Sequence, residues 1–310
     1  MSDGHRVAVY YQTQYDPNLP ANSHFGHYVS PLPLIGLITH LILAAFHVNL
    51  KPWPVPVALN DFAPDDPWFN QTWADIAVMQ SNGVKVIGML GGAAPGTYEC
   101  LIPGVTFDEY YPFLHDTIRK YKLDGMDLDV EQDVSLANIQ FLINRLKADF
   151  GDDFIITLAP VASALTEGGN LSGFDYIELE RTMGSKIAWY NAQFYSGFGS
   201  IFPEQQYIDI VEYGPGLDPS RLVASTLTNP DLGGGYVDPD EVVQSVMALA
   251  RKYGYRFGGV AGWEYFISLP NAEQPWEWAA LMKSTMNTLT RLAKKKKEEA
   301  SGPSSRRYSN

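Results

Sequence analysis

Short apolar runs, rich in β-branched and aromatic residues, recur eight times along the chain. Most of them are separated by stretches whose spacing or composition is typical of helices, and this alternation predicts repeated βα units with parallel strands. The eight predicted strands are RVAVYYQ from Arg6, HLILAAFHVN from His40, KVIGMLGG from Lys85, GMDLDVE from Gly125, FIITLAPVAS from Phe154, IAWYNAQFY from Ile187, LVASTL from Leu222 and FGGVAGWEYF from Phe257.

The number and spacing of these strands favour a single (β/α)8 barrel of the α/β class over an open, doubly wound sheet. No glycine-rich GxGxxG turn follows the first predicted strand, as a doubly wound nucleotide-binding sheet would have. The 310 residues suit one barrel, which uses about 250 residues, and 45% hydrophobic residues supply a large core. We expect residues 1–290 to form one catalytic barrel, with reactive side chains at the carboxyl ends of its strands.

The chain changes character towards its C-terminus. The last helix is predicted from Pro275, with the sequence PWEWAALMKSTMNTLTRLAKKKK. We assign residues 291–310 to a tail that is basic and then polar and is predicted to be disordered. The run Lys294–Lys297 is interpreted as a solvated helix end rather than a targeting patch.

The N-terminus, MSDGHRVAVYY, lacks the basic start and the separate apolar stretch of a signal peptide. A cytoplasmic location is therefore expected, and a secreted form whose signal peptide has been removed is the alternative. The apolar run from Leu37 to Phe46 is too short to span a bilayer, so no membrane contact is expected.

Charge and composition narrow the choice of ligand. The net charge of −13 argues against nucleic acid, whose binding depends on lysine and arginine. The chain has 7 tryptophans, 18 tyrosines and 15 phenylalanines; most aromatic rings fill cores, but those in clefts suit the apolar faces of sugars. Cys100 is the only cysteine, which excludes an intramolecular disulfide and a cysteine-based zinc site, and we interpret it as a buried, inert thiol.

The fourth predicted strand carries the strongest chemical signal. Asp127, Asp129 and Glu131 alternate with apolar residues along it, so three carboxyl groups share one face. Inside a barrel, burial and mutual repulsion raise the pKa of at least one carboxyl group, which can then hold a proton at neutral pH and act as a catalytic acid. A solvent-facing acidic strand and a divalent-metal site are the alternatives. Asp124 has the opposite parity and is predicted to cap the start of the strand.

The segment DGMDLDVE, residues 124–131, matches the DGxDxDxE signature of glycoside hydrolase family 18, which includes chitinases and some endo-β-N-acetylglucosaminidases. The chain therefore resembles this family. Gln193–Tyr195 is similar to its QFY element, and GGVAGWEYF, with Trp263, is similar to its eighth-strand signature. The resemblance covers residues 6 to about 280, and segments such as LNDFAPDDP and WYNAQFYSGFGS bring it closest to the filamentous-fungal endo-β-N-acetylglucosaminidases of the family.

One motif departs from the family pattern. The SxGG motif of the third strand reads Met89, Leu90, Gly91 and Gly92 here, so the serine hydroxyl is missing and no role can rest on it. The two glycines are interpreted as allowing a tight turn from strand to loop.

The resemblance implies substrate-assisted retention, in which the 2-acetamido oxygen of the bound sugar attacks the anomeric carbon in place of a protein carboxylate. It implies that Glu131 protonates the glycosidic oxygen and later activates water. Asp129 would accept a hydrogen bond from the acetamido N–H, and Asp127, deeper in the barrel, would share a proton with Asp129.

Further roles are implied by the same resemblance. The Tyr195 hydroxyl would stabilise the intermediate through its acetamido group, whereas a buried strand tyrosine is otherwise more often part of the core. Gln193 shares the parity of Tyr195 and is a substrate-binding candidate, and Asn191 is a weaker one. Trp263 would form the floor beneath the sugar, with filling of the barrel as the alternative role.

The function that this resemblance implies is an endo-β-N-acetylglucosaminidase, which hydrolyses the β-1,4 bond of the N,N'-diacetylchitobiose core of N-linked glycans. The expected partners are N-glycans or glycoproteins, the expected state is a monomer, and no cofactor or metal is expected. A chitinase of the same family is the alternative. A catalytically inactive chitin-binding lectin is disfavoured because Glu131 is present, and a metal-dependent barrel enzyme is a remote further hypothesis.

Overall fold

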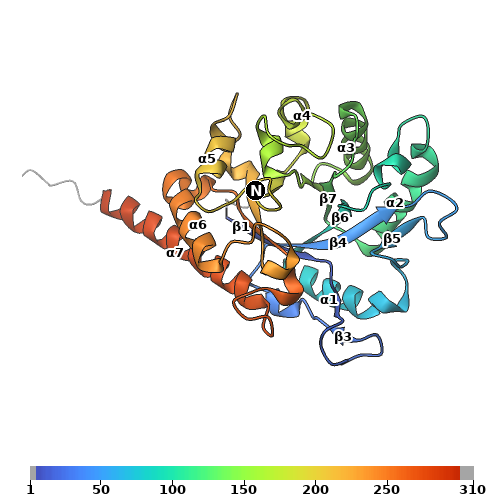
Figure 1. The fold of residues 1–310 in the computed structure, drawn as a ribbon, viewed down its shortest axis with the longest axis horizontal. Helices are drawn as coiled ribbons and strands as arrows, with labels where there is room; N and C mark the ends of the chain where they lie inside the picture. The colour runs from blue at the N-terminus through green and yellow to red at the C-terminus, as the bar shows by residue number, and fades with distance from the viewer. Residues whose placement is uncertain (1–4, 301–310) are drawn as a thin grey trace, which may run out of the picture.

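Eight parallel strands form a closed barrel in the computed structural model, which describes the backbone of residues 5–300 and the side chains of residues 5–288 (Figure 1). All eight predicted strands are present, each within a few residues of its predicted bounds. They are β1 (Arg6–Tyr11), β4 (His40–Val48), β6 (Lys85–Gly91), β7 (Gly125–Asp129), β8 (Ile155–Leu158), β9 (Trp189–Gln193), β10 (Leu222–Leu227) and β11 (Gly259–Trp263).

The barrel closes through the first strand. β1 pairs in parallel with β11, where Val9 lies opposite Gly262, and with β4, where Tyr11 lies opposite Leu43. A short antiparallel strand, β5 (Val57–Leu59), extends the far end of β4 beyond the barrel, beside it in Figure 1. The remaining strands, β2 (Tyr15–Asp16) and β3 (His27–Tyr28), form a small hairpin after β1. The loops around β2, β3 and β5 therefore build up one side of the carboxyl end of the barrel.

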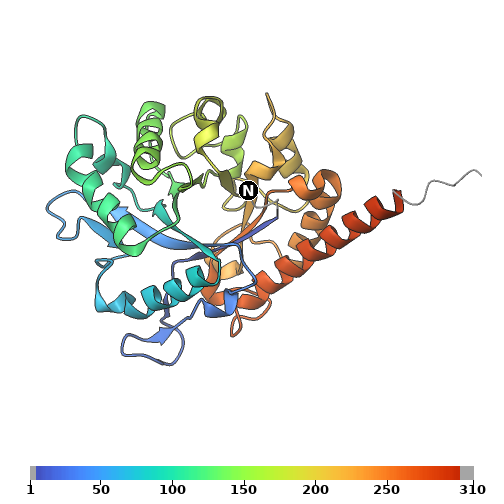
Figure 2. The ribbon, with the colours of Figure 1, turned by 180° about the vertical axis from the view of Figure 1, so that it is seen from behind.

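In the part of the chain that the structure describes, seven α-helices are present. They lie around the strands in both views (Figures 1 and 2). They are α1 (Asn70–Ser81), α2 (Phe107–Tyr121), α3 (Leu136–Phe150), α4 (Tyr176–Met183), α5 (Gln205–Glu212), α6 (Pro239–Tyr253) and α7 (Trp276–Ala300). Within the described chain, β1 is followed by the 3-10 turn Leu32–Leu34 in place of an α-helix. Pro31 and Pro33 explain this difference, because proline supplies no N–H for helical hydrogen bonds.

The apolar residues form two cores. The larger one lies between the strands and the helices and includes Met126, Leu128 and Val130, which point outward from β7 and its end. The smaller one fills the barrel interior and includes residues that alternate, along their strands, with those of the larger core, such as Tyr10 and Ile42. The alternation predicted for the fourth strand is confirmed, since its apolar residues face the helices and its carboxyl groups face inward.

The last helix ends three residues beyond the predicted helical segment, which runs to Lys297. It begins next to Pro275, as expected, but continues to Ala300, so residues 291–300 are helical and do not belong to the predicted disordered tail. Lysine, glutamate and alanine favour helix, and lysines near a helix C-terminus complement its dipole. α7 extends outward from the barrel (Figure 2). Residues 301–310, the rest of the predicted tail, lie outside the described residues. None of the described helices is long and apolar enough to cross a bilayer.

Candidate active site

The centre of the site is the carboxyl end of β7. Asp127 and Asp129 point into the barrel, and both are buried. Glu131 follows two residues beyond the last strand position and is half-buried at the mouth of the barrel. The three carboxyl groups that share a face thus form a series from the barrel interior to its opening.

Asp127 is completely buried and accepts three hydrogen bonds. Its Oδ2 accepts from the Tyr10 hydroxyl at 2.7 Å, and its Oδ1 accepts from Thr157 Oγ1 at 2.5 Å and from Asn191 Nδ2 at 3.0 Å. Burial raises the pKa of Asp127, although the three donors act in the opposite direction. Strands on three sides therefore fix this carboxyl group.

Asp129 and Glu131 share a donor. Gln193 Nε2 lies 3.1 Å from Asp129 Oδ1 and 3.2 Å from Glu131 Oε1, and it also donates to the Ala159 carbonyl oxygen at 2.9 Å. The pKa of Asp129 is raised well above its usual range, first by burial and then by the charges of Glu131 and Asp127. The raised pKa that the sequence predicts for this face therefore falls on both aspartates.

The proton predicted to be shared by Asp127 and Asp129 stays a prediction. Glu131 lies near enough to Asp129 to raise the pKa of Asp129 further. Both oxygens of Asp127 accept hydrogen bonds, from Tyr10, Thr157 and Asn191. Asp129 is thus coupled to Glu131 at the barrel mouth, and Asp127 is held by the strands beneath it.

Asn191 does not reach the opening. It is completely buried, donates to Asp127, and accepts from Trp189 Nε1 at 2.8 Å. Its predicted contact with substrate is therefore corrected to a role in holding Asp127. The reason is depth, because Asn191 lies two positions before Gln193 on β9 and so one layer lower in the barrel.

Tyr195 and Trp263 lie at the mouth of the barrel beside the carboxyl groups. Tyr195 is half-buried two residues beyond β9, and burial, followed by the charges of Asp129 and Glu131, raises the pKa of its hydroxyl. The hydroxyl therefore stays a proton donor at neutral pH. Trp263 ends β11, and its ring meets that of Tyr10 edge to face at 5.2 Å between centroids. Tyr10 thus links the tryptophan to Asp127.

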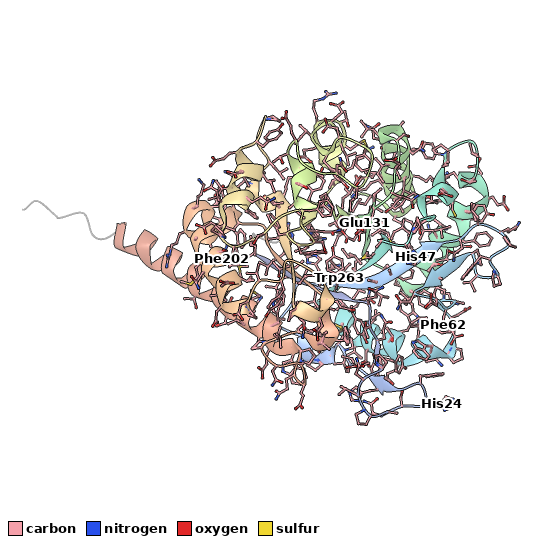
Figure 3. All side chains as sticks on the ribbon, viewed as in Figure 1. His24, His47, Phe62, Glu131, Phe202 and Trp263 are labelled. Carbon is pink, nitrogen blue, oxygen red and sulfur yellow. The ribbon has the colours of Figure 1, made fainter. Side chains whose placement is uncertain are left out.

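The side chains at the barrel mouth line one cavity of about 290 Å³, which we call the catalytic cavity. Figure 3 shows Glu131 and Trp263 near the centre of the molecule, within the ring of strands. Five of the seven predicted site residues line it: Asp129, Glu131, Gln193, Tyr195 and Trp263. Asp127 and Asn191 lie beneath it, and Met89, which stands where the family has serine, adds an apolar side chain to its wall.

The last residue of β6, Gly91, and the glycine that follows it, Gly92, form the turn that the sequence predicts. Gly91 and Gly92 have φ values of +94° and +103°. A Cβ atom on Gly91 would lie 2.4 Å from the carbonyl oxygen of Asp129. Only glycine accepts both the positive φ and this close approach, so the turn is tied to the position of Asp129.

A second, larger cavity of about 770 Å³ adjoins the first and shares Gln12, His47 and Ala94 with it. Phe62 stacks on Trp68 at 5.4 Å between centroids, and Trp53 is 56% exposed. The aromatic residues that line it are Tyr15, Trp53, Phe62, Trp68, Phe69 and Phe266. In Figure 3 His47 and Phe62 lie towards the side of β4 and β5. We call this cavity the side groove.

Asp124 lies at the opposite end of the strand from this chemistry. Its carboxyl oxygens accept from Lys85 Nζ at 2.8 Å, from Val86 N at 2.9 Å and from Gln80 Nε2 at 3.1 Å. These contacts join the starts of β6 and β7, as expected of a structural cap. Among the described side chains, no group of three or more histidine, cysteine, aspartate or glutamate residues is arranged to hold a metal ion.

The raised pKa of Asp129 gives a stability prediction. The folded protein holds a proton on Asp129 that the unfolded chain has lost above pH 4, so stability falls as pH rises from the usual aspartate pKa of 3.8 through the raised value. We expect Asp129→Asn, which mimics the protonated form, to raise the melting temperature at pH 7 by a few °C. Calorimetry at pH 7 and pH 4 checks this: the gain should shrink at pH 4, and equal or lower stability at pH 7 would contradict it.

Comparisons with known proteins agree with this geometry. No protein-family model matches the chain. The structure is similar to that of a fungal endo-beta-N-acetylglucosaminidase from glycosyl hydrolase family 18, with 45% identity and a TM-score of 0.83 over 91% of this chain and 98% of that one. It is also similar to the chitinase ChiC from Aspergillus fumigatus, with 49% identity and a TM-score of 0.79 over 91% of this chain and 99% of that one.

A curated relative in sequence is Chitinase 2 of Rhizopus oligosporus, with 30% identity over 214 residues. This match covers 62% of this chain but only 36% of that protein, so the chain corresponds to about a third of its length.

Proposed function

The chain belongs to glycoside hydrolase family 18, and from this premise we propose that it is an endo-β-N-acetylglucosaminidase that cleaves the chitobiose core of N-linked glycans. The observation that carries the proposal is the side groove, which is more than twice as large as the catalytic cavity, at about 770 Å³ against 290 Å³, and adjoins it through shared lining residues. A branched glycan needs such width next to the sugar that is cut, whereas a single linear chain does not.

The proposed reaction begins with Glu131 as general acid. It lies at the cavity mouth, half-buried, and its Oε1 is held by Gln193 Nε2. The sugar would rest on Trp263, whose ring offers an apolar face to the apolar face of a pyranose. From this position Glu131 would protonate the glycosidic oxygen and afterwards remove a proton from the attacking water.

The 2-acetamido group of the sugar would supply the nucleophile. Asp129, whose raised pKa favours its neutral form, is itself a poor nucleophile but can hold the acetamido N–H. The hydroxyl of Tyr195 is kept protonated by its raised pKa. It would donate a hydrogen bond to the carbonyl oxygen of the acetamido group and so stabilise the intermediate that forms when this oxygen attacks the anomeric carbon. Asp127 and its three donors would keep Asp129 and the tryptophan floor in place through Tyr10.

The proposed orientation of the sugar would direct the rest of the glycan into the side groove. In a pyranose, C1 and C2 are neighbours and C4 lies across the ring. If C1 lies at Glu131 and the C2 acetamido group at Asp129 and Tyr195, on the side of β7 and β9, then C4 would point towards the opposite side of the barrel, formed by β1 and β4. Gln12 and His47 lie there, where the cavity opens into the side groove. The mannose residues attached through C4 would therefore enter the groove.

A chitinase is the second candidate, and the 49% identity to the chitinase ChiC favours it. The catalytic groups would be the same, since a chitin chain also presents a 2-acetamido group at the point of cleavage. The two candidates differ in the sugar that is attached at C4: mannose in an N-glycan, and further N-acetylglucosamine in chitin.

Mass spectrometry of the products separates these candidates. We expect the protein to release the glycan from a high-mannose glycoprotein and to leave one N-acetylglucosamine on the polypeptide, a mass increment that no other cut produces. Chitin oligomers are incubated in parallel as the matched comparison. Cleavage of the oligomers with an untouched glycoprotein would reject the proposal in favour of a chitinase.

A further inference from the structure

Glu264 is a buried carboxyl group that the proposed reaction does not use. It follows Trp263 directly and is 5% exposed. Its Oε2 accepts from the backbone N–H groups of Gln12 at 2.9 Å and of Thr13 at 2.8 Å, and its Oε1 accepts from Thr13 Oγ1 at 2.8 Å. All three donors belong to the two residues that follow β1.

These two residues form part of the lining where the two cavities meet, which we call the wall. Gln12 lines both the catalytic cavity and the side groove, and Thr13 lines the side groove. Because Gln12 and Thr13 lie beyond the end of β1, the side chain of Glu264 takes the place of a neighbouring strand as acceptor for their N–H groups. A buried N–H without an acceptor is costly, so the wall depends on this carboxyl group for its conformation.

The backbone beside Glu264 is held without its side chain. Thr228 N donates to the Trp263 carbonyl oxygen at 2.8 Å, and Thr228 Oγ1 donates to the Glu264 carbonyl oxygen at 2.6 Å. Ser268 Oγ donates to the same oxygen at 3.0 Å. Removing the carboxyl group therefore releases the wall and leaves the tryptophan floor in place.

The opposite side of the wall has its own anchor. Asn60 Nδ2 donates to the Gln12 carbonyl oxygen at 3.0 Å and to Gln14 Oε1 at 3.0 Å. Asn60 N and Oδ1 are in turn joined to Ala45 of β4. Without Glu264 the segment would stay attached on this side only, so it would shift or open rather than detach.

We propose that Glu264 is a positioning residue, which fixes the Gln12–Thr13 wall so that a substrate lying on Trp263 is continued correctly into the side groove. The proposal rests on the function proposed above in one respect only, that the substrate extends from the catalytic cavity into the groove. Glu264 should therefore affect the cleavage of substrates that reach the groove, whether these are N-glycans or chitin oligomers.

The test compares three variants on short and long substrates. Glu264→Ala removes the acceptor. Glu264→Gln keeps all three contacts, because its amide oxygen can accept from both N–H groups and its NH2 can donate to the Thr13 hydroxyl. Asp75→Ala is the matched control: Asp75 is 4% exposed and accepts from Tyr28, Ser30 and Gln71, but it lines neither cavity.

Steady-state kinetics use two substrate series, asparagine-linked chitobiose without and with a high-mannose glycan, and methylumbelliferyl glycosides of increasing chitin-oligomer length. We expect Glu264→Ala to lower kcat/KM about tenfold or more for the longest substrate cleaved, mainly through KM, and less than about threefold for the shortest. Glu264→Gln should show the same ratio of kcat/KM between the longest and the shortest substrate as the wild type. Asp75→Ala should also keep this ratio, although its melting temperature should be lower.

Two results would overturn the proposal: equal losses on short and long substrates in Glu264→Ala, which indicate a general structural role, or no loss of kcat/KM on any substrate. The outcome for the function is separate. If the wild type cleaves only the chitin series, the endo-β-N-acetylglucosaminidase assignment fails, and the role of Glu264 is decided on that series.

Discussion

Replacement of Glu131 by glutamine is expected to lower the rate of hydrolysis by about 10²–10⁴-fold. Glutamine has the same shape but cannot give a proton to the leaving oxygen or take one from water. The fold should be intact, because the amide oxygen can still accept from Gln193 Nε2, the bond that holds Glu131 now. Turnover on the substrate that the wild type cleaves, together with the melting temperature, measures both parts of the prediction.

Asp133→Asn is the control for this variant. Asp133 is two residues further along the chain, is exposed and does not line the catalytic cavity, so the same change of charge there should leave turnover close to that of the wild type. Retention of more than about a tenth of wild-type turnover by Glu131→Gln would remove Glu131 from its assigned role, because general acid catalysis contributes at least about 10².

Replacement of Asp129 by alanine is expected to lower kcat by about 10²–10³-fold, with a smaller change in KM. The acetamido group would lose the partner that orients its oxygen towards the anomeric carbon, and the loss falls mainly on the transition state. The cavity should keep its shape, since Gln193 Nε2 retains the Ala159 carbonyl oxygen and Glu131 as acceptors.

Asp124→Ala, a change of the residue just before β7, provides the comparison. Asp124 bonds to Lys85, Val86 and Gln80 at the far end of β7, so its loss should lower the melting temperature and leave kcat within about threefold of the wild type. If Asp129→Ala kept wild-type kcat, or if Asp124→Ala lost as much activity as Asp129→Ala, the assignment of Asp129 to the acetamido group would be wrong.

The sequence pattern was sufficient for the barrel and for the carboxyl series. Each strand is a short apolar run, and the period of two along residues 125–131 alone separates inward carboxyl groups from outward apolar side chains. Both predictions depend on local spacing, which a single sequence contains. Parity also separates Asp124, the cap, from the reactive residues of the same strand.

The contacts that fix these groups could not be predicted in the same way. Tyr10 and Thr157 hold Asp127 across 117 and 30 residues of sequence, and within their apolar strands nothing marks either one as polar and functional. Parity placed Asn191 on the correct face but did not give its depth. Tyr10 could have been noticed as a tyrosine among the inward residues of the first strand, although such residues are more often part of the core.

The side groove and the role of Glu264 depend on loops. The groove combines residues that follow β1, β4 and β6, and Glu264 meets Gln12 across 252 residues of sequence. Loop shape is not contained in hydrophobic periodicity, so the sequence indicated the reaction class better than the substrate. The absence of an α-helix between β1 and β4 in the described chain has a local reason, the prolines at positions 31 and 33.

The participation of the substrate's own acetamido group is the central claim, and its most direct test is the rate of cleavage of methylumbelliferyl chitobiosides whose reacting acetamido group carries none, one, two or three fluorine atoms. Fluorine withdraws electrons from the carbonyl oxygen and weakens it as a nucleophile. We predict that kcat falls steeply with each fluorine added. A kcat that does not change along the series would contradict the claim and would require a protein carboxylate as nucleophile.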